Sequence, residues 1–266
     1  MPFANTSTGA RLYYDDLGNP NGEPVLAIHG WLGTARFDLG NVVDWLAAQG
    51  RYRVIGPTRR GYGESEPKPR EYPDDFYHRD AADMLAFMDA LGLERVHLLG
   101  YSDGGETALI MAGMQPERFL SVAVWGAVGY FGEKVRAAAQ SCYPADWMTD
   151  EDKQRNGIAD ANTYVLGWIR AMKAMVDAGG DVSLHLAPRI TAPLLVMLGE
   201  QDTLNPQEYA QRLVEAAAQS PDARLVMFPC GHSVHQLAWN EFQATVGAFL
   251  ERATTRHSPA IPTVTD

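Results

Sequence analysis

The sequence predicts an α/β fold in which a mostly parallel sheet is covered by helices on both faces. Short apolar runs alternate with segments of helical periodicity along most of the 266 residues, which is the pattern of a parallel sheet with crossover helices. The apolar runs are continuous, as in strands that are buried on both faces. We therefore expect a sheet at the centre of the molecule, with helices packed on each side.

Seven runs are predicted as strands, and glycine, proline or histidine residues end several of them, as is typical of turns. In chain order they are residues 11–14, 25–28, 52–56, 96–100, 120–125, 194–198 and 224–228. Two apolar stripes at helical spacing indicate helices that face the core. The stripes are Met84, Leu85, Met88 and Leu91, and Phe242, Val246, Phe249 and Leu250.

Residues 129–186 interrupt this alternation, because they show helical patterns but no clear buried strand. They are also rich in Tyr, Trp and Met. One crossover needs far fewer than these roughly 50 residues, so we interpret the segment as a helical lid; an ordinary pair of crossover helices is the alternative. Residues 1–128 and 187–254 then form the core, and the polar tail 255–266 is expected to be disordered.

The composition limits the partners. The chain has 22 Lys and Arg residues against 33 Asp and Glu residues, a formal net charge of −11, which argues against binding nucleic acids or anionic membranes. No apolar run approaches the roughly 18 residues of a membrane span, and no secretory leader is recognisable, so we expect a cytoplasmic protein. No Cys/His cluster has metal-binding spacing, and the glycine-rich turn at residues 100–105 lacks the lysine of a phosphate-binding loop. We therefore expect no metal or organic cofactor. The oligomeric state is not predicted.

The strongest chemical signal is the motif G-x-S-x-G at residues 100–104, which lies between the predicted strand 96–100 and a helical segment. A nucleophile on such a tight turn needs glycine neighbours, because the backbone there is strained and crowded. The helix that follows directs free N–H groups at the reacting oxygen. A glycine-rich turn with an N-capping serine is the alternative. We predict that Ser102 is the nucleophile.

A serine nucleophile needs a base, and the base needs an orienting acid. In doubly wound hydrolases the chain order is serine, acid, histidine. Asp202 and His232 follow two later predicted strands in this order. All three residues therefore lie at the carboxyl ends of strands, where the sites of open α/β sheets gather. We predict a catalytic triad of Ser102, Asp202 and His232.

Other residues are alternative candidates for the acid and the base of the triad. Glu200 is close to Asp202, but its longer side chain would need another loop geometry; Asp202 itself could be a turn or N-cap residue. His235 competes with His232, which we prefer because it directly follows a glycine in the loop. Most single histidines are surface or core residues. The weaker candidates are His185 and His257.

An oxyanion hole is predicted from two backbone N–H groups. Trp31 follows the predicted strand 25–28, where such enzymes supply one donor, and Asp103 directly follows the nucleophile. Each donor would stabilise the transition state by roughly 3 kcal/mol. We expect the side chain of His29, in the same loop as Trp31, to be structural.

With these motifs the chain resembles the α/β-hydrolase superfamily over residues 10–253, and within it the valacyclovir hydrolases. The resemblance rests on RGYGES at 60–65, YPDDF at 72–76, RDA at 79–81, LLGYSDGG at 98–105 and WGA at 125–127. It implies an eight-stranded-type sheet with a helical lid and a serine hydrolase acting on α-amino-acid esters. It further implies that Asp103 binds the α-ammonium group of the substrate. We also expect Trp125, in the last motif, to contact the substrate.

The chemistry of Asp103 agrees with this implication. A carboxylate beside a developing oxyanion is repulsive unless a cation compensates it, and a protonated amine α to the scissile carbonyl lies at a suitable distance. A helix N-terminal acid favoured by the helix dipole is the alternative.

We therefore expect a serine esterase that hydrolyses small carboxylic esters, in particular α-amino-acid esters, through an acyl-enzyme. Its expected partner is the small-molecule ester. The same triad could instead serve a C–C hydrolase, a lactonase, an amidase or a perhydrolase, because the lid and the pocket set the chemistry on this fold. From a different class, a non-catalytic binding protein that retains the fold is a further alternative.

Overall fold

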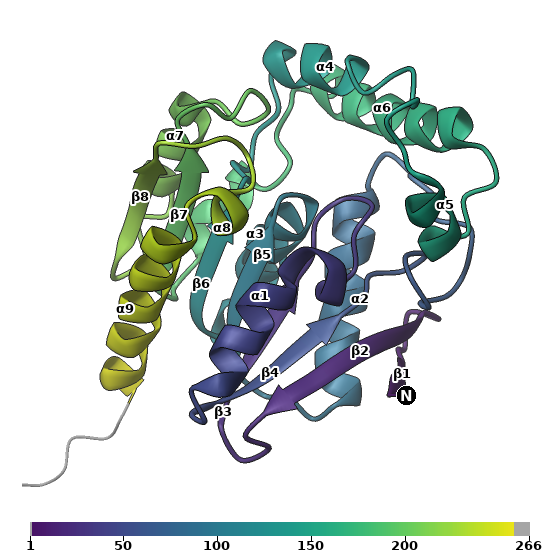
Figure 1. Ribbon diagram of the computed structural model, residues 1–266. Helices are drawn as coiled ribbons and strands as arrows, with labels where there is room; N and C mark the ends of the chain where they lie inside the picture. Colours follow the sequence, from purple (N-terminus) through teal and green to yellow (C-terminus); the bar gives the residue numbers. More distant parts are fainter. Residues whose placement is uncertain (1, 258–266) are drawn as a thin grey trace, which may run out of the picture.

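The structure, a computed structural model, describes residues 2–257, and within them an eight-stranded sheet has the order β1-β2-β4-β3-β5-β6-β7-β8 (Figure 1). Strands β1 and β2 pair antiparallel at one edge, and β2 pairs antiparallel with β4. All the other neighbours are parallel. The predicted fold class is confirmed. The strands are β1 (Phe3–Asn5), β2 (Arg11–Gly18), β3 (Glu23–Ile28), β4 (Tyr52–Pro57), β5 (Val96–Tyr101), β6 (Phe119–Trp125), β7 (Leu194–Gly199) and β8 (Ala223–Phe228).

Helices cover both faces of the sheet because each central strand is apolar on both sides. In β3, Val25 and Ala27 pack into one hydrophobic cluster, and Leu26 and Ile28 pack into the other, as the period-two alternation of a strand requires. Both apolar stripes predicted from the sequence contribute to these clusters. Helices α1 (Ala35–Ala48) and α9 (Trp239–His257) lie on the first face; α2 (Phe76–Ala90), α3 (Asp103–Met114) and α7 (Gln207–Ala216) lie on the second (Figure 1).

The two ends of the chain differ from the prediction. Strand β1 was missed because three residues are too few to show an alternating pattern. Helix α9 runs to His257, three residues into the segment predicted as a tail, and residues 258–266 lie outside the described part. The remaining short elements are α8 (Val234–Leu237) and the 3-10 helices η1 (Pro116–Arg118) and η2 (Leu184–Arg189).

The segment predicted as a lid contains three helices and the start of η2. They are α4 (Glu133–Gln140), α5 (Asp150–Asn156) and α6 (Ala161–Asp177), and in Figure 1 they lie beyond one end of the sheet. The amide of Asn156 connects α5 to the core: it donates to Leu32 O at 2.9 Å and accepts from Gly63 N at 3.0 Å. This buried side chain joins the segment to the loops after β3 and β4.

The described helices show no candidate for a membrane span: within residues 2–257 none combines the necessary length and apolar character.

The burial of α9 leads to a prediction about stability. Leu250 is fully buried in α9, whereas 63% of Leu237 in the preceding short helix is exposed. Leu250→Ala is expected to lower the free energy of unfolding in urea by about 2–5 kcal/mol, because it removes apolar contacts and leaves a cavity. The matched control Leu237→Ala should change it by less than about 0.5 kcal/mol. Equal effects of the two substitutions would show that α9 is not part of the cooperative core.

Candidate active site

Ser102 lies on a strained turn between β5 and α3, with φ 52° and ψ −122°. The residues two positions before and after it must be glycines because the turn passes very close to other backbone. A Cβ on Gly104 would lie 2.3 Å from Ile28 O, and one on Gly100 would lie 2.5 Å from Gly104 O. Strain of this kind is typical of functional sites. The turn exposes the hydroxyl of Ser102 at the carboxyl end of the sheet.

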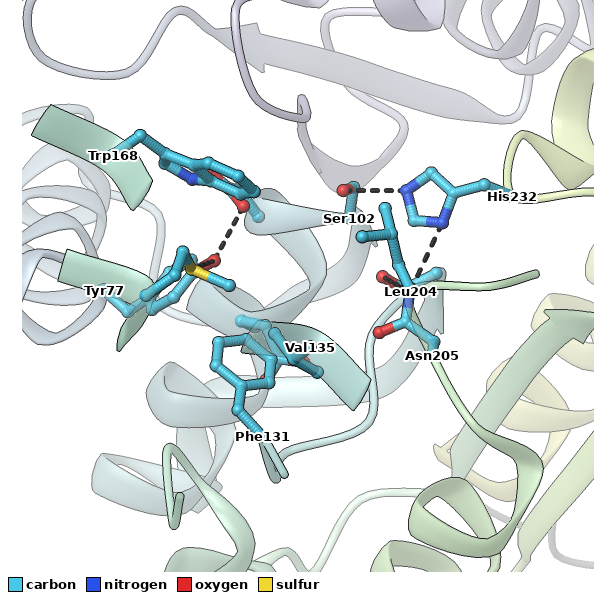
Figure 2. A pocket seen from close by; sticks show the side chains of 12 residues that line it. Tyr77, Ser102, Phe131, Val135, Trp168, Leu204, Asn205 and His232 are labelled. Carbon is cyan, nitrogen blue, oxygen red and sulfur yellow. Dashed lines mark hydrogen bonds between the residues drawn. The ribbon is translucent and has the colours of Figure 1, made fainter. Parts of the chain in front are cut away.

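The three residues predicted as a triad lie in hydrogen-bonding order. His232 Nε2 is 2.9 Å from Ser102 Oγ, and His232 Nδ1 is 2.8 Å from Asp202 Oδ2. Figure 2 shows the imidazole of His232 between Ser102 and Asn205. The three residues follow β5, β7 and β8, so the parallel sheet brings together positions 130 residues apart in sequence. This arrangement can transfer a proton from Ser102 to His232 and stabilise the resulting imidazolium.

Asn205, which the sequence did not reveal, fixes the carboxylate of Asp202. Its amide donates to Asp202 Oδ2 at 3.1 Å and to Gly126 O at 3.0 Å. The backbone N–H of Leu204 donates to Asp202 Oδ1 at 2.9 Å. Burial would raise the pKa of Asp202, but the hydrogen bonds from His232 and Asn205 lower it below its ordinary value. Asp202 is therefore ionised and held in one orientation at neutral pH.

The rival residues lie elsewhere. Glu200 is exposed at the end of β7. His235 is buried: its Nδ1 accepts the indole N–H of Trp125 at 2.9 Å, and its Nε2 donates to Asp38 O at 2.9 Å. Burial lowers the pKa of His235 to about 4, so it is a neutral structural residue. His185 is exposed and bonded to Asp181.

The expectation that Trp125 contacts the substrate is wrong. Its indole is fully buried and packs against Phe242 of α9, with ring centroids 4.9 Å apart. In β6 the side chain of Trp125 lies on the same face as Ala123, opposite Val124, because successive residues of a strand alternate between faces. The helix α3 that begins beside Ser102 packs on the other face. Gly126, the next residue, lines the pocket instead.

The loop that carries the predicted donor Trp31 is fixed by buried hydrogen bonds. His29 is structural, as expected: its Nδ1 donates to Gly30 O at 2.8 Å, and its Nε2 accepts the N–H of Arg59 at 2.9 Å. The N–H of Gly30 donates to Asp38 Oδ2 at 2.9 Å. Arg59 also donates to Gly30 O from its guanidinium, at 2.8 Å.

The backbone N–H groups of the two predicted oxyanion donors are unpaired within residues 2–257. Asp103 is the first residue of α3, so its N–H has no partner within the helix. Within residues 2–257, neither this N–H nor that of Trp31 has a hydrogen-bond acceptor in the structure. The ring of Trp31 stacks on Trp168 of α6 at a centroid distance of 4.2 Å, and its indole N–H donates to Tyr72 Oη at 2.8 Å.

Beside Ser102 lies a small, mainly apolar pocket (Figure 2). Its free volume is about 30 Å³, room for roughly one water molecule, so a substrate must displace side chains to enter. Helix α6 and the segment around α4 supply most of the apolar wall. The apolar lining residues are Phe131, Val135, Trp168, Met172 and Leu204.

Asp103 is one of the buried acids that line this pocket, and one of its carboxylate oxygens has no hydrogen-bond partner within residues 2–257. Tyr77 Oη donates to Asp103 Oδ1 at 2.7 Å. Asp103 Oδ2 has no hydrogen-bond partner in the described chain and lies 3.9 Å from Arg59 Nη2. Burial raises the pKa of Asp103, against the opposing effects of Arg59 and Tyr77. Arg59 therefore supplies part of the positive charge beside Asp103 that was expected from the substrate alone.

Arg59 belongs to a buried charge network that the sequence did not reveal. Asp80 accepts from Arg59 at 2.8 Å and, on both oxygens, from Arg70 at 2.8 and 2.7 Å. Burial would raise the pKa of Asp80, but the two guanidinium groups lower it. The network reaches Asp103 at one end and Gly30 O at the other. It therefore connects the nucleophile turn to the loop of Trp31.

Comparison with known proteins finds two family models that match the chain. Residues 23–157 match the family model described as "alpha/beta hydrolase fold", and residues 92–240 match the model described as "Serine hydrolase (FSH1)". The human serine hydrolase BPHL is 31% identical over 261 residues, which cover 91% of this chain and 84% of that protein.

Solved structures show the same architecture. A putative lipase from Acinetobacter baumannii superposes with a TM-score of 0.78 at 20% identity, covering 96% of this chain and 92% of the other. The enol-lactonase from Burkholderia xenovorans superposes with a TM-score of 0.68 at 26% identity, covering 94% of this chain and 100% of the other.

The hydroxyl of Ser102, which lines the pocket and bonds to His232, predicts selective labelling. A fluorophosphonate probe is expected to modify Ser102, because His232 can take the proton from Oγ as phosphorus is attacked. Ser102→Ala should abolish the labelling. Undiminished labelling of the Ser102→Ala protein, measured by mass spectrometry of the modified peptide, would rule out this assignment.

The contrast between the two histidines gives a second prediction. His232→Ala is expected to lower kcat for an ester by about 10⁴-fold or more, since the base is lost. His235→Ala should lower the melting temperature, because Trp125 Nε1 loses its buried acceptor, yet retain at least about a tenth of kcat, because the triad is intact. The reverse pattern in assays at 20 °C, well below unfolding, would make His235 the base.

Proposed function

The chain belongs to the α/β-hydrolase family and is a serine hydrolase, and we propose that it hydrolyses small carboxylic esters, with a preference for α-amino-acid esters. The observation that supports this proposal concerns Asp103, which lines the pocket beside Ser102. Its carboxylate oxygen Oδ2 is buried and has no hydrogen-bond partner within residues 2–257. Buried acceptors are normally paired. A substrate ammonium group would supply the missing donor.

In the proposed reaction, Ser102 Oγ attacks the ester carbonyl while His232 Nε2 takes the hydroxyl proton. Asp202 orients the imidazole and stabilises its charge. The N–H groups of Trp31 and Asp103 stabilise the negative oxygen of the tetrahedral intermediate. When the intermediate collapses, His232 returns the proton to the leaving alcohol. Water, activated by the same histidine, then releases the acid and restores Ser102.

The position of Asp103 suits an amine on the carbon next to the carbonyl. Its N–H is a proposed oxyanion donor, and its carboxylate belongs to the same residue, so both lie close to the reacting carbon. The hydroxyl of Tyr77 holds Oδ1 and leaves Oδ2 for the ligand. A charge-assisted hydrogen bond in this buried site is stronger than one in water. The ammonium also offsets the repulsion between the carboxylate and the oxyanion.

The relatives support this choice without fixing the substrate. The human relative BPHL carries the name serine hydrolase, and the structural neighbour named an enol-lactonase shares the fold. A C–C hydrolase, a lactonase, an amidase or a perhydrolase with the same triad is the alternative class. Each alternative predicts a higher kcat/KM for its own substrate class than for a simple ester, so a direct comparison of these substrates with the ester separates them.

The proposal is tested with a matched pair of esters. We expect a kcat/KM for an L-alanine ester at least about tenfold higher than for the propanoate ester of the same alcohol, since only the first carries the ammonium. The small pocket is the reason for choosing the shortest acyl groups. Equal rates would reduce the function to that of a general carboxylesterase.

Substitution of Asp103 tests the recognition itself. Asp103→Asn should reduce the ratio of kcat/KM for the two esters by about 10–100-fold, because the amide keeps the shape but removes the charge. Asp74→Asn, which removes an exposed carboxylate, is the matched control and should leave the ratio unchanged. If Asp103→Asn lowers both rates equally, Asp103 is a structural residue.

A further inference from the structure

A second buried carboxyl group lines the same pocket. Glu106 is 2% exposed and lies on α3, three residues after Asp103. Residues at this spacing are neighbours on one face of a helix, with Cβ atoms about 5–6 Å apart. The pocket thus has an acidic end formed by two side chains of the helix that begins beside Ser102.

Glu106 is oriented by the backbone and has no charged partner. Its Oε1 accepts from Val128 N at 2.7 Å and from Gly129 N at 3.1 Å, and its Oε2 accepts from Gly129 N at 3.1 Å. The hydroxyl of Ser183 also lies beside this carboxylate. A carboxylate has about four acceptor positions, so acceptor capacity remains on Oε2. Within residues 2–257 no ion pair joins Glu106 to a cation.

The charges around the pocket leave Glu106 uncompensated. The two guanidinium groups of Arg59 and Arg70 face the two carboxylates of Asp80 and Asp103, so this network is balanced without a substrate. An ionised Glu106 adds one negative charge that nothing in the network offsets. A single positive charge in the pocket would restore the balance.

We propose that Glu106 is the second carboxylate of the ammonium site, so that a primary ammonium group of the substrate is bound by Asp103 and Glu106 together. A primary ammonium has three N–H donors and can reach two acceptors one helical turn apart. This inference rests on the proposed function. It goes further by naming a second specificity-determining residue.

The preference of this two-carboxylate site for an ammonium group is expected to depend on pH. Burial raises the pKa of Glu106 to about 7, against the hydrogen bonds from Val128 and Gly129, and the charge of Asp103 raises it further. The bound ammonium favours the ionised form, so the preference for amines strengthens as pH rises through this value. The other titratable and charged groups around the pocket are Tyr77 and Asp80 of α2, Arg59 and Arg70 of the loop before it, and Asp202 and His232 of the triad.

The test follows the ratio of kcat/KM for the alanine and propanoate esters between about pH 5.5 and about pH 7.0, where the substrate amine remains protonated. Steps that the two esters share cancel in this ratio, because both esters need the same triad. In the unaltered protein we expect the ratio to rise on the order of tenfold across this range. A ratio that does not change with pH overturns the proposal, even without any variant.

Glu106→Gln provides the matched substitution, since its amide oxygen can still accept from Val128 and Gly129. We expect a ratio that is about tenfold lower at pH 7.0 and constant with pH. A structural role alone would not change a ratio of two esters. The control Glu117→Gln removes an exposed carboxylate just beyond α3 and should follow the unaltered protein. If Glu106→Gln also shows the same ratio and the same pH dependence as the unaltered protein, the inference is wrong while the proposed function stands. A ratio near one in the unaltered protein at every pH overturns both the inference and the proposed function.

Proton release gives a measurement independent of turnover. In the Ser102→Ala protein, calorimetric titration with the alanine ester in buffers of different ionisation enthalpy is expected to show release on the order of half a proton per ester at about pH 6.5. Ser102→Ala combined with Glu106→Gln should release none. Equal release from both proteins would assign the proton to another group and overturn the proposal.

Discussion

The backbone of Ser102 is the constraint on which the rest of the site depends. Its positive φ aims the hydroxyl out of the turn between β5 and α3, and a non-glycine residue adopts this conformation only where its surroundings enforce it. The enforcement comes from close backbone contacts at Gly100 and Gly104. Because β5 is a central strand of a parallel sheet, the turn emerges beside the loops that carry Asp202 and His232.

A buried charge network joins this turn to the opposite side of the site. Burying charges is unfavourable unless each is paired and hydrogen-bonded, and Asp80 meets this requirement for both Arg59 and Arg70. Arg59 then contacts the carboxylate of Asp103 and the carbonyl of Gly30. The acid beside the nucleophile and the loop of Trp31 are therefore positioned by one cation. A change in this network would therefore move the carboxylate of Asp103 and the loop of Trp31 together.

The helical segment over the sheet completes the pocket from the other side. Trp168 of α6 stacks on Trp31, and Asn156 of α5 hydrogen-bonds to Leu32 O. Leu32 itself has a φ of 63°, so the loop is strained directly after Trp31. Contacts from this segment thus stabilise the loop that presents a proposed oxyanion donor. Motion of α6 would change the pocket wall and this loop at the same time.

The sequence by itself determined the fold class and the identity of the residues that meet at the carboxyl edge. The continuous apolar runs required strands buried on both faces, and the order of Ser102, Asp202 and His232 after such runs brought these residues to one edge. These signals are local in sequence and could be recognised without a structure. Strand β1 gave no such signal because it is only three residues long.

The tertiary structure alone decided which groups surround those residues. Trp125 faces away from the pocket because strand alternation places it with Ala123, and a short motif does not reveal which face of a strand is the functional one. Asn205, Arg59 and Glu106 are ordinary polar residues in the sequence. Each acquires its role only through burial and through partners distant in the chain, because hydrogen bonding and the loss of solvent depend on the packed fold.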